Sequence, residues 1–252
     1  MFIRKMVFIG IICMLGLTGC ATNTKSGAEG EGDKRAEELL SMSRSELAKQ
    51  ESYTIEMEKQ EETSSKSEKS EDKHWSSAAS FHVDYVRNPY TVYLKSETAE
   101  GKEREEYISD TEYHTKVMDD LFIKQDNYIP AKEKQIAQRF IDPYDYIDIY
   151  RIDSQGIVVS EEEQEYILSI EISSHDASKE TMKLMKQNLT DKIKLRYTLD
   201  KTTLLPHKVE AEIFTSLKSE NLNSESVLTL QTTISNFNVI KEIVMPVDTS
   251  EE

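Results

Sequence analysis

The sequence predicts an α+β domain built on an antiparallel sheet. Apolar and polar residues alternate with a period of two in many segments, as in strands with one buried face. The links between these segments are short and polar, as antiparallel hairpins require. Apolar residues with three-to-four spacing mark helices at the start and in the middle of the chain. The resulting order of helix, strands, helices and strands is typical of the α+β class.

The first element is a helix, expected from Lys34 to Lys49. Asp33 can cap its first turn, where Glu37 and Glu38 suit the positive end of the helix dipole. One face carries the spaced positions Ala36, Leu39, Leu40, Ser43 and Leu47.

Strands follow this helix. Tyr53, Ile55 and Met57 alternate with polar residues, whereas Ser64 to Lys73 has no apolar residue and is expected to be a long exposed hairpin connection. Alternation resumes at Phe81, and an Asn88-Pro89 corner leads into the next strand. The further strands expected in this half are Tyr90 to Lys95, Glu105 to Ser109, Tyr113 to Met118 and Leu121 to Gln125.

The segment from Pro130 to Asp153 predicts two short helices, the second restarting at Asp142-Pro143 with Pro143 at a first helical position. A strand is expected from Gln164 to Ile172. Asp176 or Ser178 can then cap a helix that carries Met182, Met185 and Leu189. The expected closing strands contain Ile193 to Leu199, Val209 to Ile213 and Leu228 to Ile234, with turns at Asp200 to Thr203 and Ser219 to Ser224.

The composition is acidic and almost free of cysteine. Lys and Arg number 31 against 47 Asp and Glu, which gives a net charge of −16. A surface of this charge repels nucleic acid and anionic lipid head groups. The two cysteines, Cys13 and Cys20, both lie near the N-terminus, so the rest of the chain has no thiol for a disulfide or a zinc site.

The N-terminus predicts a secretory leader. Arg4 and Lys5 precede an apolar run from Met6 to Leu17, which is shorter than the roughly 20 residues of a spanning helix. Leu17-Thr18-Gly19-Cys20 resembles the lipobox of bacterial lipoproteins. The resemblance implies cleavage between Gly19 and Cys20 and a diacylglyceryl group on the Cys20 thiol. Residues 1–19 are then a signal peptide, 20–33 the lipidated cysteine with a glycine-containing flexible tether, and 34–252 the domain.

Four segments of the domain sequence resemble one protein family. They are Ser52 to Met57, Asn88 to Lys95, Tyr197 to Pro206 and Ile234 to Pro246. In content and order they resemble uncharacterised lipoproteins of Gram-positive bacteria that are related to the LolA and LppX lipoprotein folds. That resemblance implies a strongly curved antiparallel sheet, a half-barrel, whose concave face is closed by helices over an apolar cavity.

Apolar stripes on the predicted strands and on one helix are the candidates to line such a cavity. They are Tyr53, Ile55, Met57, Phe81, Val83, Tyr85, Val92, Leu94, Met182 and Met185. Flexible methionines adapt to an acyl chain. The same residues are also what half-buried strands need for an ordinary core, and residue by residue the core explains them better.

Motifs for catalysis or metal binding are weak. The five histidines are scattered; His82-x-Asp84 could place two ligands on one strand face, but zinc needs three or four. Asp142, Asp145 and Asp148 lack the spacing of an EF-hand loop. No nucleophile elbow or phosphate-binding glycine loop is found. We expect no enzyme activity, no metal and no cofactor.

These features predict a lipoprotein anchored at the extracytoplasmic face of the cell membrane that binds a hydrophobic or lipid-like ligand without catalysis. The alternative is a cell-envelope interaction or sensor module with a filled core and no ligand.

Overall fold

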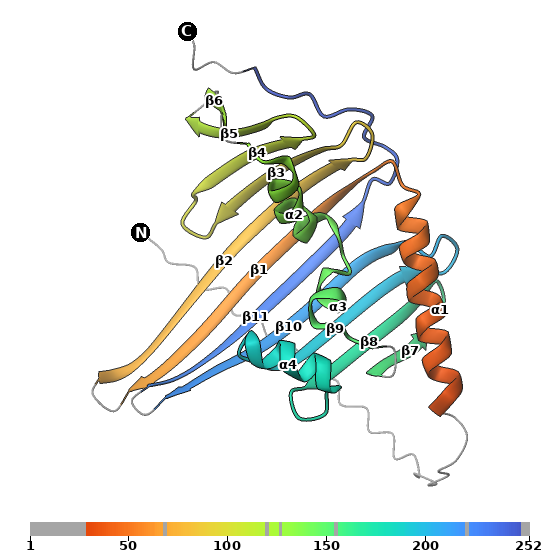
Figure 1. Ribbon diagram of the computed structural model, residues 1–252, viewed down its shortest axis with the longest axis vertical. Helices are drawn as coiled ribbons and strands as arrows, with labels where there is room; N and C mark the ends of the chain where they lie inside the picture. The colour runs from red at the N-terminus through yellow and green to blue at the C-terminus, as the bar shows by residue number, and fades with distance from the viewer. Residues whose placement is uncertain are drawn as a thin grey trace, which may run out of the picture.

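A single open antiparallel sheet forms the body of the protein. The computed structural model describes residues 29–67, 70–118, 121–125, 128–153, 156–219 and 222–247. The expected signal peptide and lipobox, with Cys20, lie outside the described residues. Eleven strands are hydrogen-bonded in the order β6-β5-β4-β3-β2-β1-β11-β10-β9-β8-β7. Short strands β6 and β7 form the two edges, so the sheet is not closed (Figure 1).

Two antiparallel runs of neighbouring strands meet at the pairing of β1 with β11. The first run contains β1 (Ser52–Ser67), β2 (Ser70–Val86), β3 (Thr91–Thr98), β4 (Glu103–Ser109), β5 (Tyr113–Met118) and β6 (Leu121–Lys124). The second contains β7 (Ile157–Glu161), β8 (Glu165–Ser173), β9 (Thr190–Asp200), β10 (Pro206–Ser219) and β11 (Leu222–Ser235). The helices are α1 (Glu29–Ala48), α2 (Pro130–Ile141), α3 (Asp145–Tyr150) and α4 (Lys179–Gln187).

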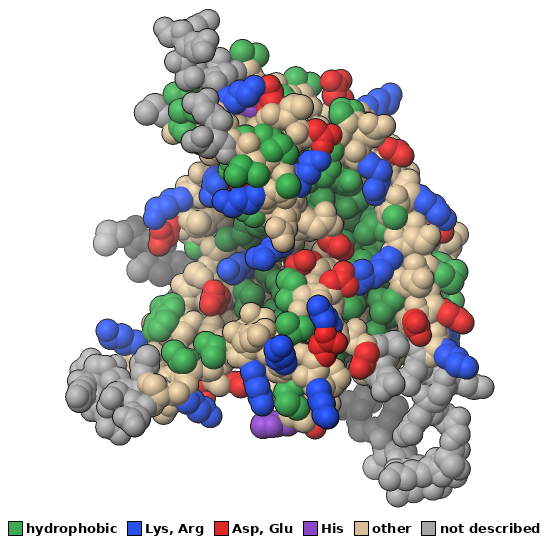
Figure 2. Space-filling view, viewed as in Figure 1, with side chains coloured by type: hydrophobic (Ala, Val, Ile, Leu, Met, Phe, Trp, Pro, Cys, Tyr) green, Lys and Arg blue, Asp and Glu red, His purple; other side chains and the backbone are tan. Residues whose placement is uncertain are grey.

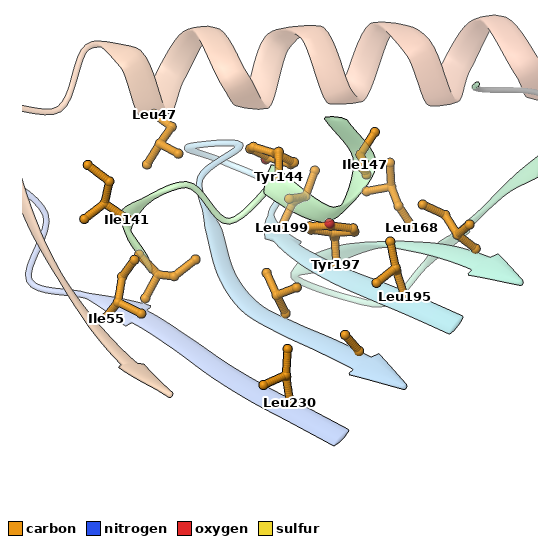
Figure 3. Close-up of a cluster of buried hydrophobic side chains, with 14 of the residues drawn as sticks. Leu47, Ile55, Ile141, Tyr144, Ile147, Leu168, Leu195, Tyr197, Leu199 and Leu230 are labelled. Carbon is orange, nitrogen blue, oxygen red and sulfur yellow. The ribbon is translucent and has the colours of Figure 1, made fainter. Parts of the chain in front are cut away.

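All four helices lie on one face of the sheet, which curves toward them (Figures 1 and 3). Ala36, Leu39 and Leu47 of α1 are buried in the same cluster as the inward-facing residues of the strands. α2 contributes Ala137 and Ile141 to this cluster. The core therefore occupies the space between the helices and the inner face of the sheet, as the amphipathic spacing predicts.

The long central hairpins correct two expectations. Residues 64–67 and 70–73, expected as part of an exposed connection, form strand, since β1 and β2 pair as far as Ser67 and Ser70. The expected turn at Ser219 to Ser224 is likewise shorter, because Ser219 pairs with Leu222. The physical reason is that ladder hydrogen bonds join backbone groups and need no apolar side chain. Each residue of β1 here also has a partner on β11.

The helices follow the sequence closely, with adjusted ends. α1 begins at Glu29, five residues before the expected start at Lys34. The two helices expected in residues 130–153 are confirmed as α2 and α3. Ser178 caps α4 by accepting a hydrogen bond from the Thr181 amide at 3.3 Å, whereas Asp176 accepts one from the Ser173 hydroxyl. In the described part of the chain, no helix is both long and apolar enough to cross a membrane.

Candidate functional site

Most of the residues expected to line a cavity are packed into the core. Seven of them belong to the buried cluster: Tyr53, Ile55, Val83, Tyr85, Val92, Leu94 and Met185. Met57 packs against its margin, Met182 is partly buried, and the Phe81 ring lies 5.5 Å from that of Phe140 on α2. Tyr53 and Tyr85 also line an open pocket at the edge of this core.

This pocket, the tyrosine–arginine pocket, lies where the end of α1, the end of α2 and the first residues of β1 meet. Its volume is about 240 Å³. The lining residues are Arg44, Leu47, Ala48, Tyr53, Tyr85, Arg87, Gln138, Ile141, Asp142 and Tyr144. Figure 3 shows Leu47 and Ile141 on the same side of Tyr144, over the curved strands.

Aromatic rings and their hydroxyls form the inner wall of the tyrosine–arginine pocket. The Tyr53 and Tyr85 rings are tilted against each other with centroids 5.0 Å apart. The Tyr53 hydroxyl donates a hydrogen bond of 2.9 Å to the Ile141 carbonyl, which ties the end of α2 to the sheet. Burial raises the pKa of the Tyr53, Tyr85 and Tyr144 hydroxyls, so they remain neutral at physiological pH.

Two arginines give the pocket its charge. Arg44 is held by Asp148 through two hydrogen bonds of 2.8 and 2.9 Å, and its guanidinium lies 4.7 Å from the Tyr144 ring centre. Arg87 instead donates to the Gln50 carbonyl at 2.9 Å, just beyond the end of α1. Among the described residues, no carboxylate lies within ion-pairing distance of Arg87. The pocket therefore joins an aromatic wall to a cation without an acidic partner.

The sequence did not single out Arg44 or Arg87, because their roles depend on long-range packing. Arg44 lies on the predicted first helix and Arg87 at the corner after a strand. Only the antiparallel pairing of β1 with β2 and the docking of α1 bring the two guanidinium groups to one pocket. The Asn88-Pro89 corner was the one local signal near Arg87.

Two wider grooves lie on the opposite face of the sheet. Their volumes are about 610 and 410 Å³, and both are lined by Thr229 and Gln231. In the larger groove the charged lining residues alternate along the strands with buried residues such as Leu195 and Ala211, so they face away from the helices. Lys194 pairs with Glu212 at 2.7 Å on this face. The larger groove thus combines these charged side chains with the exposed Val158 and with buried apolar residues of the strands.

The weak metal motifs have structural roles. His82 lies between Glu56 and Asp84, with nitrogen-to-oxygen distances of 2.6 and 3.2 Å. Asp148 holds Arg44, and Asp142 accepts a hydrogen bond from the Tyr144 amide at 2.9 Å. Within the described residues, no group of three or more His, Cys, Asp or Glu is arranged to hold a metal ion.

Comparisons with known proteins place these observations in context. Similar solved structures include the lipoprotein LppX of Mycobacterium tuberculosis, which is 9% identical with a TM-score of 0.46; the match covers 85% of this chain and all of that one. A LolA superfamily protein from Nitrosomonas europaea is 9% identical with a TM-score of 0.21, and the match covers 86% of this chain and 98% of that one. The attachment invasion locus protein Ail of Yersinia pestis is 7% identical with a TM-score of 0.21, and the match covers 73% of this chain and 99% of that one.

The similar structures thus include an LppX lipoprotein and a LolA superfamily protein, as the resemblance in the sequence implied. No curated protein matches the sequence significantly. The model of a family of unknown function, DUF6612, matches residues 35–252, and the chain belongs to that family.

Proposed function

We propose that the protein is a lipoprotein anchored through Cys20 at the extracytoplasmic face of the membrane, and that it binds a hydrophobic or lipid-like ligand without catalysis. The observation that carries the ligand part is the tyrosine–arginine pocket, which opens the helix-covered apolar face to solvent beside Tyr53 and Tyr85. Ligand sites of this kind combine an apolar wall with a few polar groups that orient the ligand.

The size of the pocket limits the mode of binding. About 240 Å³ is below the usual range of roughly 300 to 1,000 Å³ for ligand pockets. The pocket therefore accepts one end of a ligand, and a longer chain requires α2 to move away from the sheet. The contacts that would part include the Phe81–Phe140 ring contact and the Tyr53 hydrogen bond to Ile141.

Native mass spectrometry of the full chain tests this proposal. The protein is extracted from bacterial membranes in mild detergent, and any bound molecule is released and identified. We expect a stoichiometric apolar or amphipathic molecule in the wild type. Ala48→Trp fills the tyrosine–arginine pocket from its exposed rim and abolishes binding, whereas Ala131→Trp, on the exposed first turn of α2, leaves it unchanged.

The alternative, an interaction or sensor module, is favoured by the packing of seven expected lining residues into the core. The two grooves on the opposite face of the sheet would then serve a protein partner. A wild-type protein that carries no ligand and does not bind a fluorescent fatty acid would support this alternative and contradict the ligand-binding proposal.

A further inference from the structure

The exposed face of α4 carries a stripe of lysines on an otherwise acidic protein. Lys179, Lys183 and Lys186 are spaced by four and three residues, so they share one side of the helix. The opposite side buries Thr181 and Met185 in the domain. We call these three lysines the α4 lysine stripe.

The α4 lysine stripe has no acidic partner. Among the described residues, no ion pair involves any of the three lysines, and the acid on this helix, Glu180, pairs with Arg151 instead. Figure 2 shows Lys and Arg side chains gathered over α4 on the lower part of the molecule. The stripe therefore presents a local positive field.

An exposed apolar side chain follows the stripe. Leu189, just after α4, is 49% exposed and adopts a left-handed backbone conformation with φ of 56°. A bulky residue rarely adopts this conformation without support from its surroundings. Here the Leu189 carbonyl accepts a hydrogen bond of 3.1 Å from the Ser216 amide, which holds the segment in place. A short stretch that carries three lysines and an exposed leucine has the residue types of a surface that lies on anionic lipid.

The position of α4 agrees with this interpretation. α4 and the first turn of α1 lie at the same end of the molecule, whereas the C-terminal segment lies at the other end (Figure 1). Eight residues separate Cys20 from Glu29, where α1 begins. A chain of that length spans at most about 30 Å. An anchor at Cys20 therefore brings the α4 end of the molecule next to the bilayer.

We infer that the α4 lysine stripe and Leu189 dock the domain on the anionic head groups of the membrane that holds the anchor. This inference rests on the anchor part of the proposed function. Docking fixes the orientation of the domain and holds the tyrosine–arginine pocket at a set height above the lipid.

A nitroxide label tests the inference on the full lipidated chain. Gln187→Cys places the label on the exposed end of α4, and Val239→Cys places one at the other end as a control. Both proteins are reconstituted into phosphatidylcholine vesicles with and without phosphatidylglycerol. We expect anionic lipid to reduce collisions of the residue 187 label with a water-soluble nickel chelate, and 1 M salt to reverse the effect. The residue 239 label should not respond.

Charge variants sharpen the test. Lys179→Gln, Lys183→Gln and Lys186→Gln together should reduce the ratio of docked to undocked protein on the order of 100-fold. The matched triple Lys132→Gln, Arg139→Gln and Lys241→Gln, outside α4 and likewise without an ion pair among the described residues, should leave it unchanged. If the chain floats with vesicles but the residue 187 label ignores anionic lipid, the docking inference is wrong and the anchor stands. If the chain does not float with vesicles, the anchor fails and the inference fails with it.

Discussion

Tyrosine hydroxyls fasten the helices to the sheet. Tyr53 of β1 donates to the carbonyl of Ile141 at the end of α2, and Tyr150 of α3 shares a hydrogen bond of 3.0 Å with Thr190 of β9. Tyr144 and Ser43 are hydrogen-bonded between the α2–α3 connection and α1. The fully buried Tyr197 stacks on Tyr144, but its hydroxyl has no partner among the described residues (Figure 3).

Loss of the Tyr53 hydroxyl and loss of the Tyr197 hydroxyl should therefore have different effects on the free energy of unfolding. Tyr53→Phe loses a satisfied buried hydrogen bond and leaves the Ile141 carbonyl unpaired, so it should lower the free energy of unfolding by about 1 kcal/mol or more. Tyr197→Phe removes an unpaired hydroxyl and should be neutral or stabilising. Denaturant unfolding monitored by circular dichroism compares them. Equal destabilisation by both substitutions would contradict this assignment.

His82 should make stability depend on pH. Partial burial alone lowers the pKa of His82, but hydrogen bonds to Glu56 and Asp84 raise it above its usual 6.5. Because the folded state binds the proton more tightly, this stabilisation is complete below about pH 6.5 and is lost as pH rises through the raised pKa. Between pH 5.5 and pH 8.5, the free energy of unfolding should fall more in the wild type than in His82→Gln. His175→Gln, at an exposed site, should behave like the wild type.

At the scale of elements, Met185 is the fully buried apolar side chain through which α4 joins the core. Met185 is fully buried against the sheet, whereas Met42 on α1 is 51% exposed. Met185→Ala should therefore lower the free energy of unfolding by about 2 to 5 kcal/mol through lost contacts and a cavity. Met42→Ala, the same chemical change at the surface, should stay within about 0.5 kcal/mol of the wild type. A small effect of Met185→Ala would mean that α4 is not packed as described.

Strand periodicity predicted most elements, because a half-buried strand must alternate. The strands around Tyr53, Phe81 and Tyr197 are found where alternation placed them. The polar ends of the β1–β2 hairpin were missed, since they contain no apolar residue that could show alternation and are ordered by the backbone ladder. Strand β7 was also missed: Ile157 is buried while Val158 is exposed, but five residues at an edge give too short a pattern.

The pocket was less predictable than the fold. Tyr53 and Tyr85, which line the pocket, were predicted as apolar positions of strands. The same pattern also selected Ile55 and Val83, which are buried in the core and do not line the pocket. Arg44 and Arg87 carry no periodic signal, because a charged residue on a helix or at a corner is usually solvated. Their convergence depends on how α1 packs on the sheet, which spacing along the chain does not encode.

At the scale of the whole molecule, the proposed anchor and the charge act together. Loss of residues 1–19 removes Arg4 and Lys5 and leaves a net charge of −18. Such a body is repelled by anionic lipid over most of its surface, so acyl chains must supply the attachment. Two chains suffice for stable anchoring, at about 0.8 kcal/mol for each buried methylene. The α4 lysine stripe would then decide which end faces the bilayer.

The anchor itself gives the last prediction. Cys20→Ser removes the thiol that receives the diacylglyceryl group, so we expect an unprocessed precursor that incorporates no labelled fatty acid. Cys13→Ser is the matched control, since Cys13 lies within the leader and should be lost with it. That variant should be labelled and processed like the wild type. Fatty-acid incorporation into Cys20→Ser at the wild-type level would refute the lipobox, and with it the orientation that places α4 at the membrane.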